Sequence, residues 1–311
     1  MNRNYQVTNR WGVPQWQTLD EARPPVDVDT EVAPVISAIV VFWEESPPFG
    51  PCLQNLRKAG HRLGDALEII VVDNGSQRDL ADTLTGLWDH WIEISANLGP
   101  GHARNIGARV AQAPVIAFVD EDARLDEDYF RNALTYFDDP DVLGIRGRIE
   151  PLQHPLFSAL ATHYHRGPEP VDDALITEGA SIVRRSVFVD AGGFPHNVDG
   201  HEGIEMTHRL KQLRPDGKTL YVPDVVLHHD YVEGWREFIA KATRHAHNEV
   251  DIENRDPEAA KFLDEYFSRT FPGPDLTYLQ QIARQLLRAI RFLIQSGARF
   301  RTRLQRREKS P

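Results

Sequence analysis

The sequence predicts an α/β fold with a mostly parallel central sheet that is flanked by helices and followed by a helical C-terminal extension. Apolar, β-branched runs typical of strands buried on both faces of a sheet occur at residues 35–43, 67–74 and 114–122. Segments of helical composition separate these runs, as the βαβ units of a parallel sheet require. The chain ends in a long stretch, residues 279–307, whose apolar residues recur at helical spacing.

The elements of the first half follow in the order that such units need. Residues 1–33 are polar and contain paired prolines and several acids, so we expect a leader that packs late or only in part. A Pro/Gly loop after the first strand leads into a short helix over 52–59, which precedes the second strand. A helix over 79–91 and a short strand over 91–95 are expected next.

The second half begins with a helix over 100–113 and the third long strand. Residues 145–235 then change character, with small-residue and acidic segments and a strand-like run over 219–230. A helix is expected over 234–250, and the acidic stretch 251–267 is expected to be a linker to the tail.

Composition and charge limit the class of protein. The chain is 41% hydrophobic and 26% charged, which is ordinary for a globular protein and excludes disordered, collagen-like and coiled-coil chains. No run approaches about 18 uncharged apolar residues, and the first residues lack a signal-peptide core, so we expect a cytoplasmic protein. The single cysteine, Cys52, excludes a disulfide framework and leaves oxygen and imidazole as metal ligands. The net charge of −11 argues against a nucleic-acid partner.

The tail differs electrostatically from the rest of the chain. Residues 278–311 contain nine arginines and lysines and one glutamate, a local charge of +8, whereas residues 1–277 carry −19. An apolar stripe runs along the tail at Leu279, Ile282, Leu286, Ile290 and Leu293. A basic amphipathic helix of this kind binds anionic membrane surfaces, which would place the protein on the inner face of the cell membrane. The alternative is a helix packed on the body of the protein or on the partner in a homodimer.

Two carboxylates end the third long strand, in the sequence Asp120-Glu121-Asp122. Because side chains alternate along a strand, Asp120 and Asp122 are expected on one side of the chain. Two carboxylates on one side suit Mg²⁺ or Mn²⁺ and let the ion also bind a substrate phosphate. The alternative is a solvated acidic turn that begins the next helix.

Polar or aromatic residues also follow the other strands, where ligands of open parallel sheets bind. Trp43 and Glu44 follow the first strand, and Asp73 and Asn74 end the second. Asp73 is suited to accept hydrogen bonds from a base or ribose, or only to shape a turn. The segment 97–101 (NLGPG) precedes a helix whose N-terminus suits a diphosphate. Neither a P-loop nor the dinucleotide-binding glycine pattern after the first strand is present.

With these segments the chain resembles the inverting glycosyltransferases of family 2, which have the GT-A fold. The resemblance covers about residues 35–235 and rests on VISAIVVFW, EIIVVDNGS, NLGPGHARNIGARVAQAPVIAFVDED, GASIVRRSVFVDAGGF and GHEGIEMTHRL, which follow the family's order and approximate spacing. It implies transfer of one sugar from a nucleotide-diphosphate donor to the hydroxyl of a glycan or lipid-linked acceptor. Such reactions build surface polysaccharides, glycolipids and glycoprotein glycans.

The resemblance also implies roles for individual residues. The donor-binding residues would be Phe42, Trp43, Glu44, Asp73, Asn74, Gly99, Arg104, Asn105 and Asp120. Asp120, Asp122 and His229 would hold Mn²⁺ or Mg²⁺. His229 matches the family's usual offset better than its neighbour His228 does.

The catalytic base is the main departure from the family. Its members carry Glu-Asp-x-Asp or Glu-Asp-x-Glu where this chain has Glu202-Gly203-Ile204-Glu205, so the usual aspartate falls on Gly203. Glu202 at a helix start is the better-placed base, and Glu205 one turn later is the second candidate. Alternatively, Glu202 only interacts favourably with the helix N-terminus.

The resemblance divides the chain into a leader, a catalytic domain and an extension. The catalytic domain would span 34–235, with a nucleotide-sugar-binding half over 34–125 and an acceptor-binding half over 126–235. Residues 236–311 would form the helical extension with its basic amphipathic tail.

Two other functions remain as alternatives. A nucleotidyltransferase would need a loop rich in Gly, Arg and Lys after the first strand, and FWEESPPFGP contains neither Arg nor Lys. A degenerate GT-A protein that acts as a binding or scaffold subunit is suggested by Gly203 and predicts donor binding without turnover.

Overall fold

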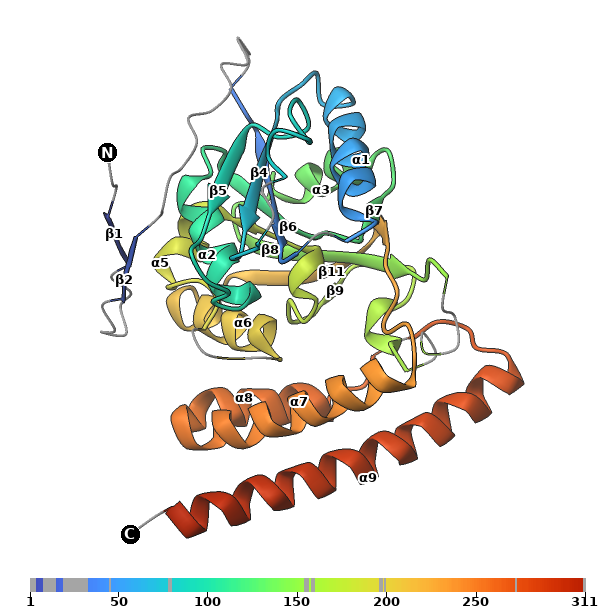
Figure 1. Cartoon of the computed structure of the whole chain (residues 1–311). Helices are drawn as coiled ribbons and strands as arrows, with labels where there is room; N and C mark the ends of the chain where they lie inside the picture. The colour runs from blue at the N-terminus through green and yellow to red at the C-terminus, as the bar shows by residue number, and fades with distance from the viewer. Residues whose placement is uncertain are drawn as a thin grey trace.

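The computed structural model describes residues 33–44, 46–77, 80–153, 157, 160–195, 198, 200–271 and 273–309, together with strands β1 (Asn4–Val7) and β2 (Gln15–Thr18). β1 and β2 pair antiparallel in a two-stranded sheet of their own (Figure 1). Most of the predicted leader, 1–33, lies outside the described residues.

The central sheet is mixed but mostly parallel. Its strands are β3 (Ile36–Phe42), β4 (Leu67–Asp73), β5 (His90–Glu93), β6 (Val115–Asp120), β7 (Arg124–Leu125), β8 (Val142–Glu150), β9 (Val171–Asp172), β10 (Ser181–Arg184) and β11 (Lys218–His228). In the part of the chain that the structure describes, their order is β5-β4-β3-β6-β10-β8-β11-β7, with β9 paired to β11. β5, β4, β3 and β6 are parallel, β10 runs antiparallel between β6 and β8, and β8 and β11 are parallel.

Helices cover both faces of this sheet (Figure 1). They are α1 (Phe49–His61), α2 (Pro100–Val110), α3 (Tyr129–Tyr136), α5 (Arg185–Asp190), α6 (Glu202–Leu213), α7 (Trp235–Arg255), α8 (Pro257–Ser268) and α9 (Tyr278–Lys309), with short 3-10 helices η1 (Thr162–Tyr164) and η2 (Glu178–Ala180). α1 and α3 contribute to one hydrophobic core, and α2, α5 and α6 contribute to the core on the opposite face. This architecture agrees with the predicted α/β fold class.

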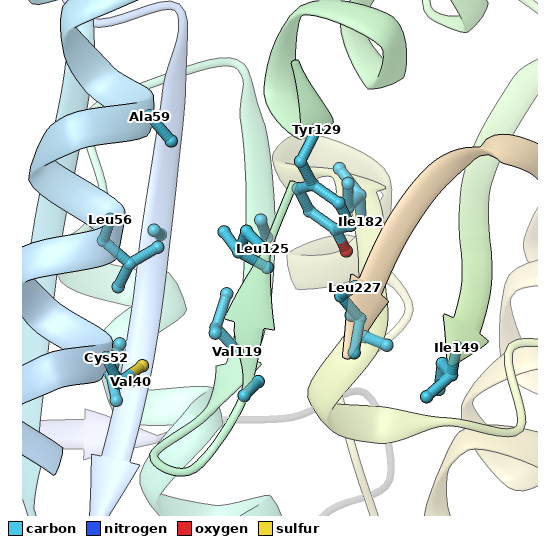
Figure 2. Close-up of a cluster of buried hydrophobic side chains, with 14 of the residues drawn as sticks. Val40, Cys52, Leu56, Ala59, Val119, Leu125, Tyr129, Ile149, Ile182 and Leu227 are labelled. Atoms are coloured by element: carbon cyan, nitrogen blue, oxygen red, sulfur yellow. The ribbon is translucent and has the colours of Figure 1, made fainter. Parts of the chain in front are cut away.

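The alternation of side chains in β3 explains why its whole run is apolar. Ala38 and Val40 belong to the core beneath α1, whereas Ile39 belongs to the core beneath α2. Figure 2 shows Val40 with Cys52 and Leu56 of α1 in one cluster. Because both faces are covered by helices, each position of the strand needs an apolar side chain.

The helix predicted over 79–91 is wrong. The chain forms successive turns over 81–86, and β5 begins near the end of the predicted segment. Gly86 has φ +85°, which ends any helix there, and the buried indole of Trp88 donates to the carbonyl of Ala81 at 3.3 Å. The apolar residues of this segment therefore pack on the core as a loop.

The acidic linker predicted over 251–267 is also wrong, because α7 continues to Arg255 and α8 follows almost at once. Asp256 accepts a hydrogen bond from the backbone N–H of Ala259 at 3.0 Å, and Pro257 occupies the first turn. An aspartate N-cap followed by proline is a helix start, so the signal was present in the sequence.

The predicted tail helix is confirmed as α9, which has 32 residues and runs alongside α7 (Figure 1). Leu287 of α9 and Phe238 of α7 are buried in the same cluster, and Arg299 forms an ion pair with Glu249. The tail therefore packs on the body of the protein along one of its faces. Among the helices that the structure describes, none is long and apolar enough to span a membrane.

Candidate active site

A cleft of about 1250 Å³ opens at the carboxyl ends of β3 and β6. Trp43, which follows β3, and Asp120, which ends β6, line it together with the loop 97–101 before α2. Other walls come from the segment that contains η1, from η2, from the first turn of α6 and the loop before it, from the segment after β11, and from helices α7, α8 and α9. This is the edge at which open parallel sheets bind their ligands.

The loop before α2 is held in place by side-chain hydrogen bonds. The Nδ2 of the buried Asn74 donates to Oδ1 of Asn97 at 3.1 Å, and its Oδ1 accepts from the backbone N–H of Leu98 at 3.0 Å. Gly99 has φ +82°, which side chains rarely permit, and begins α2. Gly99 thus lines the cleft at a helix N-terminus, while Asn74 supports the loop from behind.

The two aromatic residues at the end of β3 point in different directions. Trp43 lines the cleft and is 56% exposed, so its face is open to a flat ligand. Phe42 is buried, and its ring stacks on Phe49 of α1 with 4.3 Å between centroids. The structure therefore places the side chain of Phe42 in the core, on the same face as Val40, and not in the wall of the cleft.

The acids at these strand ends take part in the turn after β4. Asp73 is buried, which raises its pKa, and its Oδ1 accepts from the backbone N–H of Ser76 at 2.8 Å. The backbone N–H of Glu44 donates to Oγ of Ser76 at 2.9 Å. Ser76 thereby joins the ends of β3 and β4. The side chains of Asp73 and Glu44 lie near each other but are not part of the lining of the cleft.

Two neighbouring polar residues of α2 have different partners. Arg104 lines the cleft, and its guanidinium donates to Oδ1 of Asp120 at 2.6 Å. Asn105 is buried and bonds the backbone N–H and carbonyl of Phe194, each at 2.9 Å. Arg104 therefore positions the first aspartate of the Asp-x-Asp pair, whereas Asn105 fixes the loop after α5.

The structure brings Asp120, Asp122 and His229 together, from the ends of β6 and β11. Nε2 of His229 lies 3.2 Å from Oδ1 of Asp122 and 3.9 Å from Oδ2 of Asp120. Burial alone would lower the pKa of His229, but the hydrogen bond to Asp122 and the charge of Asp120 raise it above its usual value. His228 instead pairs with Asp126 at 2.9 Å.

The chemistry of these three side chains fits a divalent cation. Two ligand atoms that bind one ion at about 2.0–2.2 Å are themselves about 3–4 Å apart, as the imidazole and carboxylate atoms are here. Across the described residues, no group of three His, Cys, Asp or Glu side chains has the geometry of a preformed metal site. A site of this kind would be completed by oxygens of a bound phosphate, which is how Mg²⁺ is usually held.

Glu178 is a further carboxylate in the cleft that the sequence interpretation missed. It enters from η2, which lies close to β6 because residue 179 is glycine: a Cβ at Gly179 would lie 1.9 Å from Oδ1 of Asp120. Oε1 of Glu178 accepts from the backbone N–H of Gly203 at 2.7 Å. The available signal was one acidic residue in an otherwise small-residue segment before a strand.

Glu202 begins α6, is buried, and lines the cleft. Burial and the neighbouring charge of Glu178 raise the pKa of Glu202 to about 7. A carboxyl group with such a pKa is suited to accept a proton near neutral pH.

The second candidate base lies elsewhere. Glu205 is buried and accepts two hydrogen bonds from Arg255 of α7, at 2.8 and 2.7 Å. Its carboxylate therefore joins α6 to the end of α7. The glycine between the two acids has a steric reason, because a Cβ at Gly203 would lie 1.9 Å from the carbonyl oxygen of Leu175. An aspartate cannot occupy this position without movement of the backbone.

Lys241 of α7 was also missed, because its helix was expected to be separate from the site. It lines the cleft, and its Nζ donates to the carbonyl of Tyr231 at 2.9 Å. Burial and the charge of Arg244 lower the pKa of Lys241 to about 8, while its own charge contributes to the lowered pKa of Asp122.

Sequence comparison finds a match to a known family over part of the chain. Residues 37–188 match the family model described as Glycosyl transferase family 2. The chain is 26% identical over 207 residues to the pre-mycofactocin glycosyltransferase of Mycobacterium tuberculosis, covering 62% of this chain and 43% of that protein. It is 29% identical over 185 residues to the O-antigen chain rhamnosyltransferase RfbN of Salmonella typhimurium, covering 53% of this chain and 57% of that protein. The chain thus spans about half the length of these curated relatives.

Solved structures of glycosyltransferases share the fold. The mannosyltransferase PcManGT from Pyrobaculum calidifontis, in complex with GDP-Man and Mn²⁺, has a TM-score of 0.61 and 18% identity, covering 91% of this chain and 90% of that one. TarS of S. aureus in complex with UDP-GlcNAc has a TM-score of 0.51 and 15% identity, covering 81% of this chain and 79% of that one. These likenesses confirm the predicted GT-A fold.

Proposed function

Because residues 37–188 of this chain form a glycosyltransferase family 2 domain, we propose that the protein is a metal-dependent, inverting glycosyltransferase. It moves one sugar from a nucleoside-diphosphate donor to an acceptor hydroxyl. The observation that carries the proposal is the meeting of Asp120 and His229 with Glu202 in one cleft at the carboxyl edge of the sheet. Support also comes from PcManGT, whose structure holds a nucleotide-sugar and Mn²⁺.

Donor binding uses the sheet side of the cleft. The exposed face of Trp43 takes the nucleobase, and the N-terminus of α2 with its Gly99 loop receives the diphosphate. Asp120, Asp122 and His229 hold Mn²⁺ or Mg²⁺, which neutralises the diphosphate as it leaves the sugar. Arg104 orients Asp120 through one hydrogen bond, and its other guanidinium N–H groups contact the donor from the wall of the cleft.

Transfer is a single displacement at the anomeric carbon. The acceptor oxygen attacks this carbon from the side opposite the diphosphate, the bond between carbon and phosphate oxygen breaks, and the configuration inverts. Glu202 accepts the acceptor's proton, and the nearby charge of Glu178 makes Glu202 a stronger base than an ordinary carboxylate. This assignment gives the role of the family's aspartate to a side chain that starts α6.

Purified full-length protein with Mn²⁺ and a panel of UDP-, GDP- and dTDP-linked sugars tests the proposal. We expect release of nucleoside diphosphate from one donor, by transfer or slow hydrolysis, and its loss when the metal is chelated. Binding of a donor with no release under any condition would contradict the enzyme and favour the degenerate binding subunit, for which Gly203 is the motivating observation.

We further propose that α9 holds the protein on an anionic bilayer. Four large apolar side chains seven residues apart are exposed on it: Leu279, Leu286, Leu293 and Phe300, by 76, 61, 70 and 65%. Residues 278–307 contain no acid. The −19 charge of residues 1–277 is repelled by an anionic surface, so the +8 tail becomes the contact.

Replacing Leu286 and Leu293 together by glutamine should abolish sedimentation with vesicles containing phosphatidylglycerol. Each leucine buried in the bilayer contributes about 1.5–3 kcal/mol to binding, so the loss of two should weaken binding by about 3–6 kcal/mol, which is a hundredfold or more. Leu152→Gln, which changes an exposed leucine of the body, should bind as wild type does. High salt should weaken binding only in part, because the apolar contact is not screened. If the double variant instead dissociates a dimer and wild type ignores vesicles, this face is a protomer interface.

A further inference from the structure

The wall of the cleft made by α7 and α9 is basic. It carries Lys241, Arg244 and His245 from α7, and Arg288, Arg291, Gln295 and Arg299 from α9. Two acids of α7, Glu249 and Glu253, lie in the same wall. Glu249 binds Arg299 and lies 3.4 Å from Nε2 of His201. The wall therefore holds five lysine and arginine side chains and two carboxylates.

Two arginines of α9 have no direct partner among the described residues. Arg288 and Arg291 form no hydrogen bond and no ion pair with any part of the chain that the structure describes. Lys241 adds a third cation: its Nζ donates to the carbonyl of Tyr231, and its charge also interacts with Glu178 and Asp120. Cations that lie close together repel one another, so a bound anion would stabilise this arrangement.

Polar atoms beside these arginines also lack partners. Nδ1 of His245 and Nε2 of Gln295 are inaccessible to solvent, and neither has a hydrogen-bond partner among the described residues. A buried polar atom without a partner costs about 1–3 kcal/mol, so its presence in the wall of a cleft points to a ligand that satisfies it. This observation is independent of the charge of the wall.

The wall lies on the side of the cleft where the acceptor must bind. His201, the residue before Glu202, stacks on His245 with 4.4 Å between ring centroids. The charge of Arg291 also contributes to the lowered pKa of His245, so this arginine is near the same point. A ligand on α7 and α9 is therefore adjacent to the proposed base, whereas Trp43 and the loop before α2 belong to the donor side.

We propose that this wall binds a phosphate or diphosphate group carried by the acceptor, with Arg288 and Arg291 as its main ligands. The proposal rests on the proposed function, because it assigns the acceptor of that reaction. Guanidinium groups match phosphate oxygens with paired hydrogen bonds, and Lys241 adds a point charge. The exposed apolar face of the same helix places these arginines at the level of lipid headgroups, so we assign the phosphate to a lipid-linked acceptor.

Binding of inorganic pyrophosphate to the full chain in EDTA tests the site, because chelation removes metal-dependent binding on the donor side. We expect saturable binding that weakens at least about tenfold when Arg288 and Arg291 are both replaced by glutamine, since two charge-assisted contacts are lost. Arg301→Gln removes the same charge from an exposed position of α9 outside the cleft and should change little. Circular dichroism establishes that each variant keeps its helices.

Equal affinity in wild type and the double variant, or no binding by wild type, would overturn the anion site. Since no turnover is measured, either result leaves the proposed transferase activity standing. The source of the phosphate is tested with dodecyl phosphate below its micelle concentration against inorganic phosphate. At least about tenfold tighter binding of dodecyl phosphate, dependent on the two arginines, supports a lipid-linked acceptor. Equal affinity for the two probes overturns it in favour of a water-soluble phosphate.

Discussion

Replacing Glu202 by glutamine is expected to lower kcat by about 10²–10⁴-fold while the donor binds with near wild-type affinity. Glutamine keeps the shape of the side chain in its buried position at the start of α6 but cannot accept a proton. In the proposed scheme the donor binds the other side of the cleft, so its dissociation constant, measured by calorimetry with Mn²⁺, should change little.

Glu205→Gln is the matched control for this variant, because it makes the same change one helical turn away. Its carboxylate pairs with Arg255, so its loss should reduce stability slightly and leave kcat near wild type. An inactive Glu205→Gln together with an active Glu202→Gln would exchange the two roles.

The pH dependence of kcat/KM should show the same base. Burial and Glu178 raise the pKa of Glu202 to about 7, so Glu202 is protonated below that pH and cannot accept the acceptor's proton. The rate should therefore fall as pH decreases through about 7. Glu178→Gln removes the neighbouring charge but keeps the oxygen that accepts from Gly203, so the acid limb should move to lower pH. An unmoved limb would mean that another group titrates.

The parallel half of the sheet was predictable because its strands are buried on both faces, which leaves long apolar runs in the sequence. The alternation along 36–42 also contains the information that Phe42 faces the core with Val40, although the family resemblance implied a donor contact. The turns over 81–86 were not predictable from apolar periodicity, because loop residues such as Trp88 pack on the core and mimic one face of a helix.

The cleft itself was predictable only in part. Asp120 and Asp122 could be placed at a sheet edge because consecutive residues of one strand end are close by covalent geometry. Glu178 reaches the same point through η2, and Arg291 reaches it through the packing of α9 on α7. Contacts between elements so far apart in the sequence depend on tertiary packing, and no local pattern in one sequence encodes them.

Gly203 shows why a departure from a family pattern needs the structure for its interpretation. In the sequence it suggested a lost base and a degenerate protein. In the structure its missing side chain lets the backbone approach Leu175, and its N–H binds Glu178. The same residue thus brings a second carboxylate close to Glu202, which raises the pKa of the proposed base.

Replacing Asp122 by alanine is expected to reduce metal-dependent turnover by about a thousandfold or more. A divalent ion supplies several kcal/mol of charge stabilisation to a leaving diphosphate, and each 1.4 kcal/mol is about a factor of ten. Asp122 and His229 lie 3.2 Å apart at the ends of two strands, so the loss of either removes a ligand that no nearby side chain replaces without rearrangement. Full activity of this variant in EDTA would exclude the proposed metal site.

Metal binding can be measured separately from turnover by thermal unfolding with and without Mn²⁺. An ion that binds only the folded protein stabilises it by about 2.7 kcal/mol at a hundred times its dissociation constant, so the Tm of wild type should rise. The Tm of Asp122→Ala should not respond. Asp126→Ala breaks the neighbouring Asp126–His228 pair, 2.9 Å long, and should respond to Mn²⁺ as wild type does. Because this control also removes an aspartate that pairs with a histidine at the end of β11, a difference between the variants assigns the ion to the Asp122–His229 side. An equal response of both variants would place the ion elsewhere.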